Sequence, residues 1–274
     1  MSLLLEKSDH LHAITLKLVA TESGQLPKNL NRAAHAQVLT WISAANRELG
    51  DLLHNMQGAP ISVSDLLGNH RPQRVKAGDE FLLRIGILQG TLLQPLLQGI
   101  EKCERDKVEI AQLSFAITGI FAMPGSHPWV GSSQYSMLFT TAGSQSEIIL
   151  DFRSPTSFKQ DQIVQPFPLP ASVFGSLLRR WNTFAPEAFE LPKIEWQGLV
   201  AAFEIKSKII QMKGGAQKGA VGWVRYQFPN EEQSKIANTL AHFAYFSGVG
   251  RKTAQGMGQT YLRLPGTKPK PRKR

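Results

Sequence analysis

The order of strand-like and helix-like segments in the first half of the chain limits the folds available to it. Apolar alternation predicts strands over 12–20, 61–67, 81–88 and 108–123, and helical spacing of apolar residues predicts helices over 29–45, 48–54 and 91–103. Since the second of these helices only extends the first after a break, the order is β-α-β-β-α-β. That order is typical of a ferredoxin-like domain.

The second half of the chain repeats this pattern less clearly, after a Pro- and Gly-containing stretch at 124–128. Strand material is expected over 135–152, 199–212, 221–228 and 258–264, helices over 173–184 and 231–246, and a hairpin tip over 213–219. We therefore predict an α+β fold of two tandem ferredoxin-like (RRM-like) domains, over 1–124 and 129–264, with a basic disordered tail over 265–274. Such sheets are a common RNA-binding architecture.

Composition limits the classes of protein to which the chain can belong. Of its 274 residues 42% are hydrophobic, enough to bury the core of one large or two ordinary domains. The single cysteine, Cys103, excludes an intramolecular disulfide and a multi-cysteine metal site. Because a signal-peptide pattern and an apolar run of about 18 residues are both missing, we expect a soluble, cytoplasmic protein outside the membrane.

The chain is basic, with a formal net charge of +10 at pH 7, and residues 268–274 hold five cations and no anion. This terminal stretch either assists RNA binding non-specifically or only keeps the chain soluble. The rest of the chain still has a net positive charge, which favours a polyanionic partner.

Two Gly-x-Gly pairs stand near the C-terminus, between a segment of helical pattern and the final strand. Gly248 and Gly250 form the first pair, Gly256 and Gly258 the second, and the five residues between them include Arg251 and Lys252. Paired glycines let several backbone N–H groups converge on one anion, and the two cations add charge there. The loop leaves a helix C-terminus, whose dipole repels phosphate, so a phosphodiester chain fits better than a nucleotide cofactor. The alternative is a helix C-cap followed by a glycine-rich turn.

This loop resembles the C-terminal motif of the CRISPR repeat-processing endoribonuclease family. That motif is glycine-hydrophobic-glycine, five residues with at least one Lys or Arg, and glycine-hydrophobic-glycine again. Other segments resemble the family in the same order along the chain, at 53–58, 152–158, 168–170, 173–182, 219–224 and 243–248. The resemblance therefore spans most of the chain and rests on an ordered set of segments.

The resemblance implies a fold of two ferredoxin-like domains and metal-independent cleavage of the repeat RNA in a long CRISPR transcript, which releases guide RNAs. In this chemistry the 2′-OH of the RNA attacks the adjacent phosphorus, and the products end in a 2′,3′-cyclic phosphate and a 5′-OH. No cofactor and no metal are expected. The alternative is a non-catalytic subunit that retains mature guide RNA in an effector complex. Effector-complex proteins and a second copy of the chain are possible partners besides the RNA.

Histidine suits the two proton transfers of this reaction, because its pKa lies near neutrality. The resemblance places the family's catalytic histidine at His54; otherwise His54 is a helix-terminal residue favoured by the helix dipole. Some family members carry a tyrosine on the preceding helix, at the position of Leu39, and His35, one turn earlier, is our candidate for that role. The alternative is that His35 is an exposed helix histidine. On one straight helix the two histidines would lie about 28 Å apart, so they share a site only if the chain turns back near Asn46.

The residue that stabilises the charged phosphorane stays open at this level, because Pro60 stands where some family members have a lysine. The nearest basic candidates are Lys28, Arg32 and the loop pair Arg251 and Lys252. On a helix of the second domain, Arg179 and Arg180 either read repeat RNA or form a solvated face. The expected RNA-binding residues are therefore Lys28, Arg32, Arg179, Arg180, Gly248, Gly250, Arg251, Lys252, Gly256 and Gly258, beside the catalytic candidates His54 and His35.

Overall fold

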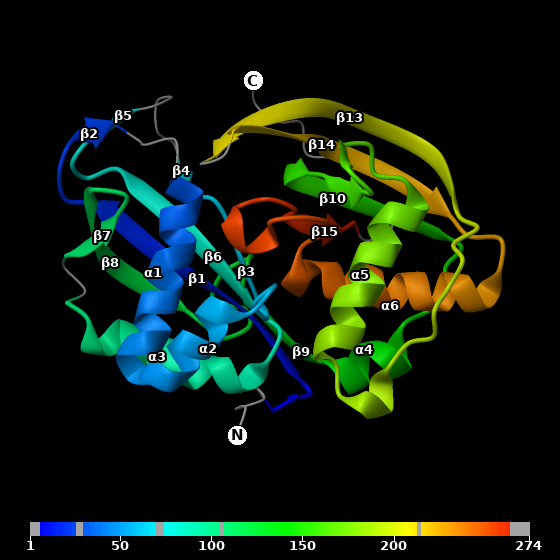
Figure 1. Ribbon diagram of the computed structural model, residues 1–274, viewed down its shortest axis with the longest axis horizontal. Helices are drawn as coiled ribbons and strands as arrows, with labels where there is room; N and C mark the ends of the chain where they lie inside the picture. Colours follow the sequence, from blue (N-terminus) through cyan, green and yellow to red (C-terminus); the bar gives the residue numbers. More distant parts are fainter. Residues whose placement is uncertain (1–5, 26–29, 69–73, 105–106, 213–214, 264–274) are drawn as a thin grey trace.

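The computed structural model describes residues 6–25, 30–68, 74–104, 107–212 and 215–263. Two α+β halves lie side by side in it, and the chain crosses from one to the other near its middle (Figure 1). Each half has its own hydrophobic core of buried residues. The expected fold class, two tandem ferredoxin-like domains, is confirmed by the strand order of both halves.

The N-terminal half follows the expected order of elements. It contains β1 (His10–Ala20), β2 (Gly24–Gln25), α1 (Leu30–Ala45), α2 (Arg47–Asn55), β3 (Ile61–Val63), β4 (Leu67–Gly68), β5 (Arg74–Val75), β6 (Glu80–Ile87), the short 3-10 helix η1 (Gly90–Leu92), α3 (Leu93–Lys102), β7 (Val108–Ile110) and β8 (Leu113–Phe121). The main path of the sheet is β3-β6-β1-β8-β7, with antiparallel neighbours. Apolar residues at helical spacing on α1, such as Ala34, Val38 and Trp41, are fully buried in its core.

The C-terminal half repeats this arrangement. It contains β9 (Gly131–Gln134), α4 (Tyr135–Thr141), β10 (Glu147–Thr156), β11 (Phe158–Gln160), β12 (Ile163–Gln165), α5 (Pro170–Phe184), the 3-10 helix η2 (Glu187–Phe189), β13 (Leu199–Met212), β14 (Gly215–Gln227), α6 (Glu231–Ser247), the 3-10 helix η3 (Thr253–Gln255) and β15 (Thr260–Leu262). The order of its four-stranded sheet is β13-β14-β10-β15. The expected domain limits stay a prediction, and β9, which follows the expected boundary, pairs with β1 of the first sheet.

A buried arginine ties the two halves together. Arg84 on β6 is only 1% exposed, and its guanidinium donates to the carbonyls of Trp129 (3.1 Å) and Tyr245 (2.6 Å) and to Gln259 Oε1 (3.2 Å). The guanidinium also lies 4.3 Å from the ring centroid of Tyr245. These contacts reach from the first sheet to α6 and to the residue preceding β15, so they hold the relative position of the halves.

Two segments that were predicted as continuous strands have another secondary structure. The run at 108–123 is a hairpin of β7 and β8, because Ala111 and Gln112 both take left-handed conformations (φ 54° and 67°). Such a turn usually contains Asn or Gly, and this one contains neither. The start of the run at 135–152 is the helix α4, whose Ser136 donates its amide (2.8 Å) and its hydroxyl (2.6 Å) to the Asp9 carboxylate. That partner lies 127 residues away, beyond the reach of a local pattern.

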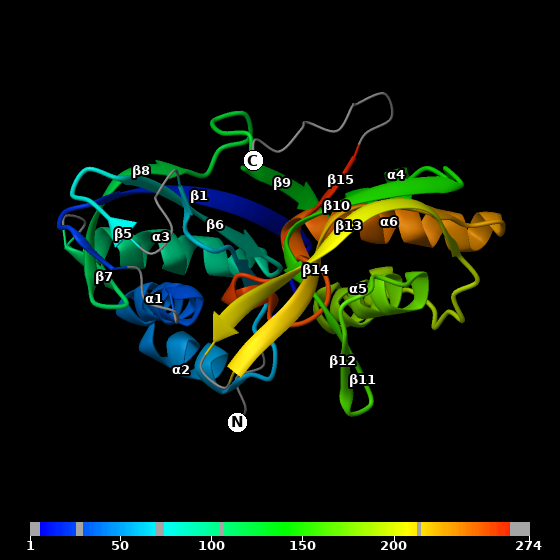
Figure 2. The ribbon, with the colours of Figure 1, turned by 90° about the horizontal axis from the view of Figure 1, so that it is seen from above.

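The long β13–β14 hairpin extends from the C-terminal half over the junction toward α1 (Figures 1 and 2). Pairing continues to its end, where Met212 lies opposite Gly215. The hairpin therefore brings residues of the second sheet next to helices of the first half. Among the helices described, none has the length and apolar character needed to cross a bilayer. The expected basic tail, 265–274, lies outside the described residues.

Candidate active site

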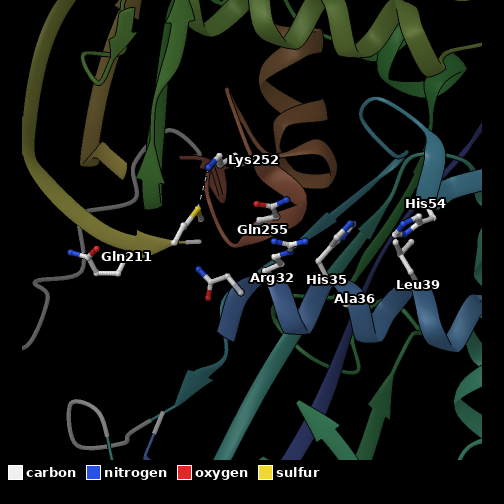
Figure 3. Close-up of a pocket in the computed structure, with 10 residues that line it drawn as sticks. Arg32, His35, Ala36, Leu39, His54, Gln211, Lys252 and Gln255 are labelled. Carbon is white, nitrogen blue, oxygen red and sulfur yellow. Dashed lines mark hydrogen bonds between the residues drawn. The ribbon is translucent and has the colours of Figure 1, made fainter. Parts of the chain in front are cut away.

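An open cleft of about 440 Å³ lies where three segments meet: the helices of the first half, the tip of β13 and the glycine-rich loop. Its lining residues are Asn31, Arg32, His35, Ala36, Leu39, His54, Gln211, Met212, Lys252 and Gln255. Figure 3 shows Arg32 and His35 rising from α1 toward the glycine-rich loop, with His54 beside Leu39. Both predicted catalytic histidines therefore line one cleft.

A break between two helices brings these histidines together. Helix α1 ends at Ala45, and Asn46 begins α2 as its N-cap, with its side chain accepting the Leu49 amide at 3.0 Å. Helix α2 then folds back against α1 so closely that a Cβ on Gly50 would overlap with Ser43. The turn at Asn46, which a shared site required, is thus present. His54 stands near the C-terminus of α2 with its side chain exposed.

His35 is half-buried, and its Nδ1 atom is enclosed without a hydrogen-bond partner among the described residues. Burial lowers the pKa of His35 below its usual 6.5, and the nearby charges of His54 and Arg32 lower it further. His35 is therefore a neutral imidazole at pH 7, which is the form that accepts a proton.

The pKa of His35 gives a first test of this geometry. Replacing Arg32 with glutamine removes a positive neighbour, so protonation of His35 becomes easier and its pKa rises. In an NMR titration of the RNA-free protein, the His35 imidazole signals should titrate at higher pH in Arg32→Gln than in wild type. Lys235→Ala, an exposed cation near the start of α6, is the control and should leave the titration unchanged. A pKa that stays fixed or falls in Arg32→Gln would contradict the proximity of the two side chains.

The glycine-rich loop is packed into the protein by its own amides. Those of Gly248, Gly250, Gly256 and Gly258 donate to the Ala244 carbonyl (2.9 Å), Ser176 Oγ (3.3 Å), the Val63 carbonyl (3.0 Å) and the Pro155 carbonyl (3.1 Å). An N–H group that already donates to a protein acceptor is not free for an anion. The predicted convergence of these four glycine amides on a phosphate is therefore wrong, and a phosphate contact of the loop would come from its other amides or from its side chains.

The glycines are needed for the close approach of the loop to its neighbours. Gly256 has φ +83°, and a Cβ there would lie 2.5 Å from Nδ2 of the buried Asn31 on α1. Together with the bond from its amide to Val63 on β3, this contact anchors a loop of the second half on the first half. The anchor places Lys252, four residues earlier, at the wall of the cleft.

The predicted basic residues separate into three groups. Arg32 and Lys252 line the cleft; Arg251 is half-buried and Arg179 is exposed, but neither lines it. Lys28 lies outside the described residues.

The position of Arg180 corrects the prediction that its side chain reads repeat RNA or lies on a solvated face. Its Nη2 donates to the carbonyls of Ala59 (3.2 Å) and Ile61 (2.8 Å), across the boundary between the halves. Its guanidinium also lies 5.6 Å from the Phe184 ring centroid. Burial lowers the pKa of Arg180 to about 10, so it stays charged at neutral pH. Arg180 therefore joins the two halves instead of facing solvent.

Five cleft residues were missed by the sequence analysis: Asn31, Ala36, Gln211, Met212 and Gln255. Gln211 and Met212 belong to the tip of β13, more than 150 residues along the chain from α1. The sequence predicted a hairpin tip over 213–219, but residues 215–219 are already paired with β13, and the direction in which the hairpin points depends on the curvature of the sheet. Within the described part of the chain, no group of three His, Cys, Asp or Glu side chains could hold a metal ion.

Comparison with known proteins gives a consistent picture. Residues 150–260 match the family model described as CRISPR-associated endoribonuclease Cas6. Among solved structures, a Cas6 (TTHA0078) product complex is 26% identical, with a TM-score of 0.70 and coverage of 93% of this chain and 100% of that chain. The Thermus thermophilus Cas6 protein TTHB231 is 24% identical, and its product complex has a TM-score of 0.79 over 93% of this chain and 100% of that chain.

More distant structures share the fold alone. A Cas6-related protein from Pyrococcus furiosus is 17% identical, with a TM-score of 0.62, and the match covers 94% of this chain and 100% of that chain. The search of curated proteins finds no match.

Proposed function

We propose that this chain belongs to the Cas6 family of CRISPR-associated endoribonucleases, whose family model matches residues 150–260, and that it cuts CRISPR precursor RNA within the repeats, without a metal, by attack of the 2′-OH on the adjacent phosphorus. The products are guide RNAs with 2′,3′-cyclic phosphate and 5′-OH ends. The observation that carries the proposal is the meeting of His35, His54 and Lys252 in one cleft open to solvent.

The two histidines divide the proton transfers between them. His35, neutral because burial lowers its pKa, takes the proton from the 2′-OH as the P–O2′ bond forms. His54, exposed at the end of α2, then donates a proton to the 5′-oxygen as the P–O5′ bond breaks. Each transfer contributes roughly 10²–10⁴-fold to such a reaction. In this arrangement His35 does the work for which some family members use a tyrosine.

The experiment is to incubate the purified protein with end-labelled repeat RNA in excess EDTA and to map the product ends. We expect cleavage at the same rate as without chelator, with a 2′,3′-cyclic phosphate on the upstream product and a 5′-OH on the downstream product. Loss of cleavage in EDTA, or a 5′-phosphate on the downstream product, would instead indicate a metal-dependent mechanism.

A second candidate function is favoured by the absence of tyrosine and lysine at two positions, Leu39 and Pro60, where some family members carry them. In this alternative the protein binds repeat RNA and retains it in an effector complex without cutting it. The same incubation separates the two, because stable binding without any cut product supports the alternative. Association with effector-complex proteins and formation of a homodimer remain predictions, which co-purification and light scattering would check.

A further inference from the structure

Lys252 occupies a special place in the cleft. Of the two adjacent cations of the glycine-rich loop, Lys252 lines the cleft together with Arg32, His35 and His54, whereas Arg251 does not. Figure 3 shows its side chain reaching from the loop toward the tip of β13. The loop that carries it is held on both sides, by the Gly258 amide on Pro155 and by the Gly256 amide on Val63. The position of this ammonium group is therefore set by both halves of the protein.

The backbone of Lys252 is unusual for a residue with a side chain. It lies in the left-handed region, with φ 55° and ψ 34°, just before η3. Residues without a special requirement seldom take this conformation, and those that do cluster at functional sites. A glycine would fit this backbone with less strain, so the presence of lysine indicates a use for its side chain.

The hydrogen-bond partner of the Lys252 ammonium is a weak one. Its Nζ lies 3.6 Å from Sδ of Met212, and a thioether is a poor hydrogen-bond acceptor. Burial, and then the charge of Arg251, lower the pKa of Lys252, so its surroundings disfavour the charged form. An ammonium in this state gains more from an arriving anion than one already paired with a carboxylate.

We infer that Lys252 is the cation that binds the scissile phosphate and stabilises the phosphorane, moving from Met212 to a non-bridging oxygen when RNA enters the cleft. This inference rests on the proposed function. It gives Lys252 the charge-stabilising role of the lysine that some family members carry at the position of Pro60. The ammonium keeps its three protons throughout. The proton of the 2′-OH goes to one histidine as the P–O2′ bond forms, and the 5′-oxygen receives a proton from the other as the P–O5′ bond breaks. Lys252 acts only on the charge of the pentacoordinate phosphorus group.

The test replaces Lys252 with glycine, which suits the left-handed backbone and removes the side chain, and with arginine, which keeps the charge. Single-turnover cleavage at saturating protein should fall about 10-fold or more in Lys252→Gly, since a preorganised charge on the transition state is lost. Lys252→Arg should recover most of this loss. Affinity for a repeat RNA with a 2′-deoxy nucleotide at the cut position, which cannot react, should change much less than the rate. Lys235→Ala, at the opposite end of α6 from the loop, is the control for the loss of one positive charge and should cleave like wild type.

Three outcomes would overturn the assignment: an unchanged rate in Lys252→Gly, a rate that falls no more than the affinity, or a rate that Lys252→Arg does not improve. Circular dichroism and thermal unfolding of each variant would show whether the protein is still folded. Failure of the inference is distinguishable from failure of the proposed function. In the first case the wild-type protein cuts repeat RNA and Lys252→Gly cuts it equally well, and in the second the wild type does not cut at all.

Discussion

Replacing His54 with alanine is expected to slow cleavage of repeat RNA at least ~10²-fold, because the variant loses one of the two groups that we propose to transfer protons. Its affinity for a 2′-deoxy repeat RNA should stay close to that of wild type. The side chain of His54 is exposed at the end of α2, so its removal leaves no buried cavity and should leave the fold intact. The measurement is a single-turnover rate together with a binding isotherm for the uncleavable RNA.

The control for this variant is His242→Ala. His242 is also an exposed helix histidine, but it lies on α6 and does not line the cleft. The His242→Ala variant should therefore cut at the wild-type rate. A His54→Ala protein with unchanged cleavage would remove His54 from the mechanism, whereas equal losses in both variants would point to a general effect on RNA binding or folding.

Replacing Gly258 with alanine is expected to lower the free energy of unfolding by about 2–5 kcal/mol. A left-handed alanine costs about 1–2 kcal/mol, and a methyl group forced into a packed site adds about 1–3 kcal/mol. Both apply at Gly258, since its φ is +72° and a Cβ there would overlap with the Val249 carbonyl oxygen. Val249 and Gly258 both belong to the loop that sets Lys252 in the cleft, so cleavage should fall as well. Urea unfolding measures the first effect.

Gly78→Ala separates backbone strain from crowding. Gly78 has φ +90° and no atom within 4 Å of a Cβ, so this variant carries only the left-handed cost of about 1–2 kcal/mol. Gly258→Ala should be clearly less stable than Gly78→Ala. If the two variants were equally stable but Gly258→Ala had lost its affinity for RNA, the packing role that we assign to the loop glycines would be wrong.

Much of the fold could be read from local patterns. The helices α1, α3, α5 and α6 were recognised because their apolar residues recur at helical spacing, and these are the residues buried in the two cores. The turn of Ala111 and Gln112 and the start of α4 were not recognised. In both, the deciding feature is tertiary: a left-handed turn without the usual residues, and a cap supplied by the distant Asp9.

The candidate site was partly predictable, because a histidine after a helix break and a cationic glycine-rich loop are local features of the chain. Arg179 and Arg180 show the limit of such reasoning. They are adjacent cations on one helix, yet one is exposed and the other donates to the carbonyls of Ala59 and Ile61. Neighbouring positions on a helix point about 100° apart, so which of them meets solvent depends on what packs against the helix.

The sequence by itself determined the class of fold, the resemblance to a family and the residue types available for the proposed chemistry, since these follow from periodicity and from motifs a few residues long. Only the tertiary structure decided which of those residues meet. It turned α2 back on α1 so that His35 and His54 share a cleft, it used the glycine amides for packing, and it set Lys252 against Met212. The physical reason is that side chains distant in sequence come together only through the packing of whole helices and sheets, and that packing depends on contacts spread over the entire chain.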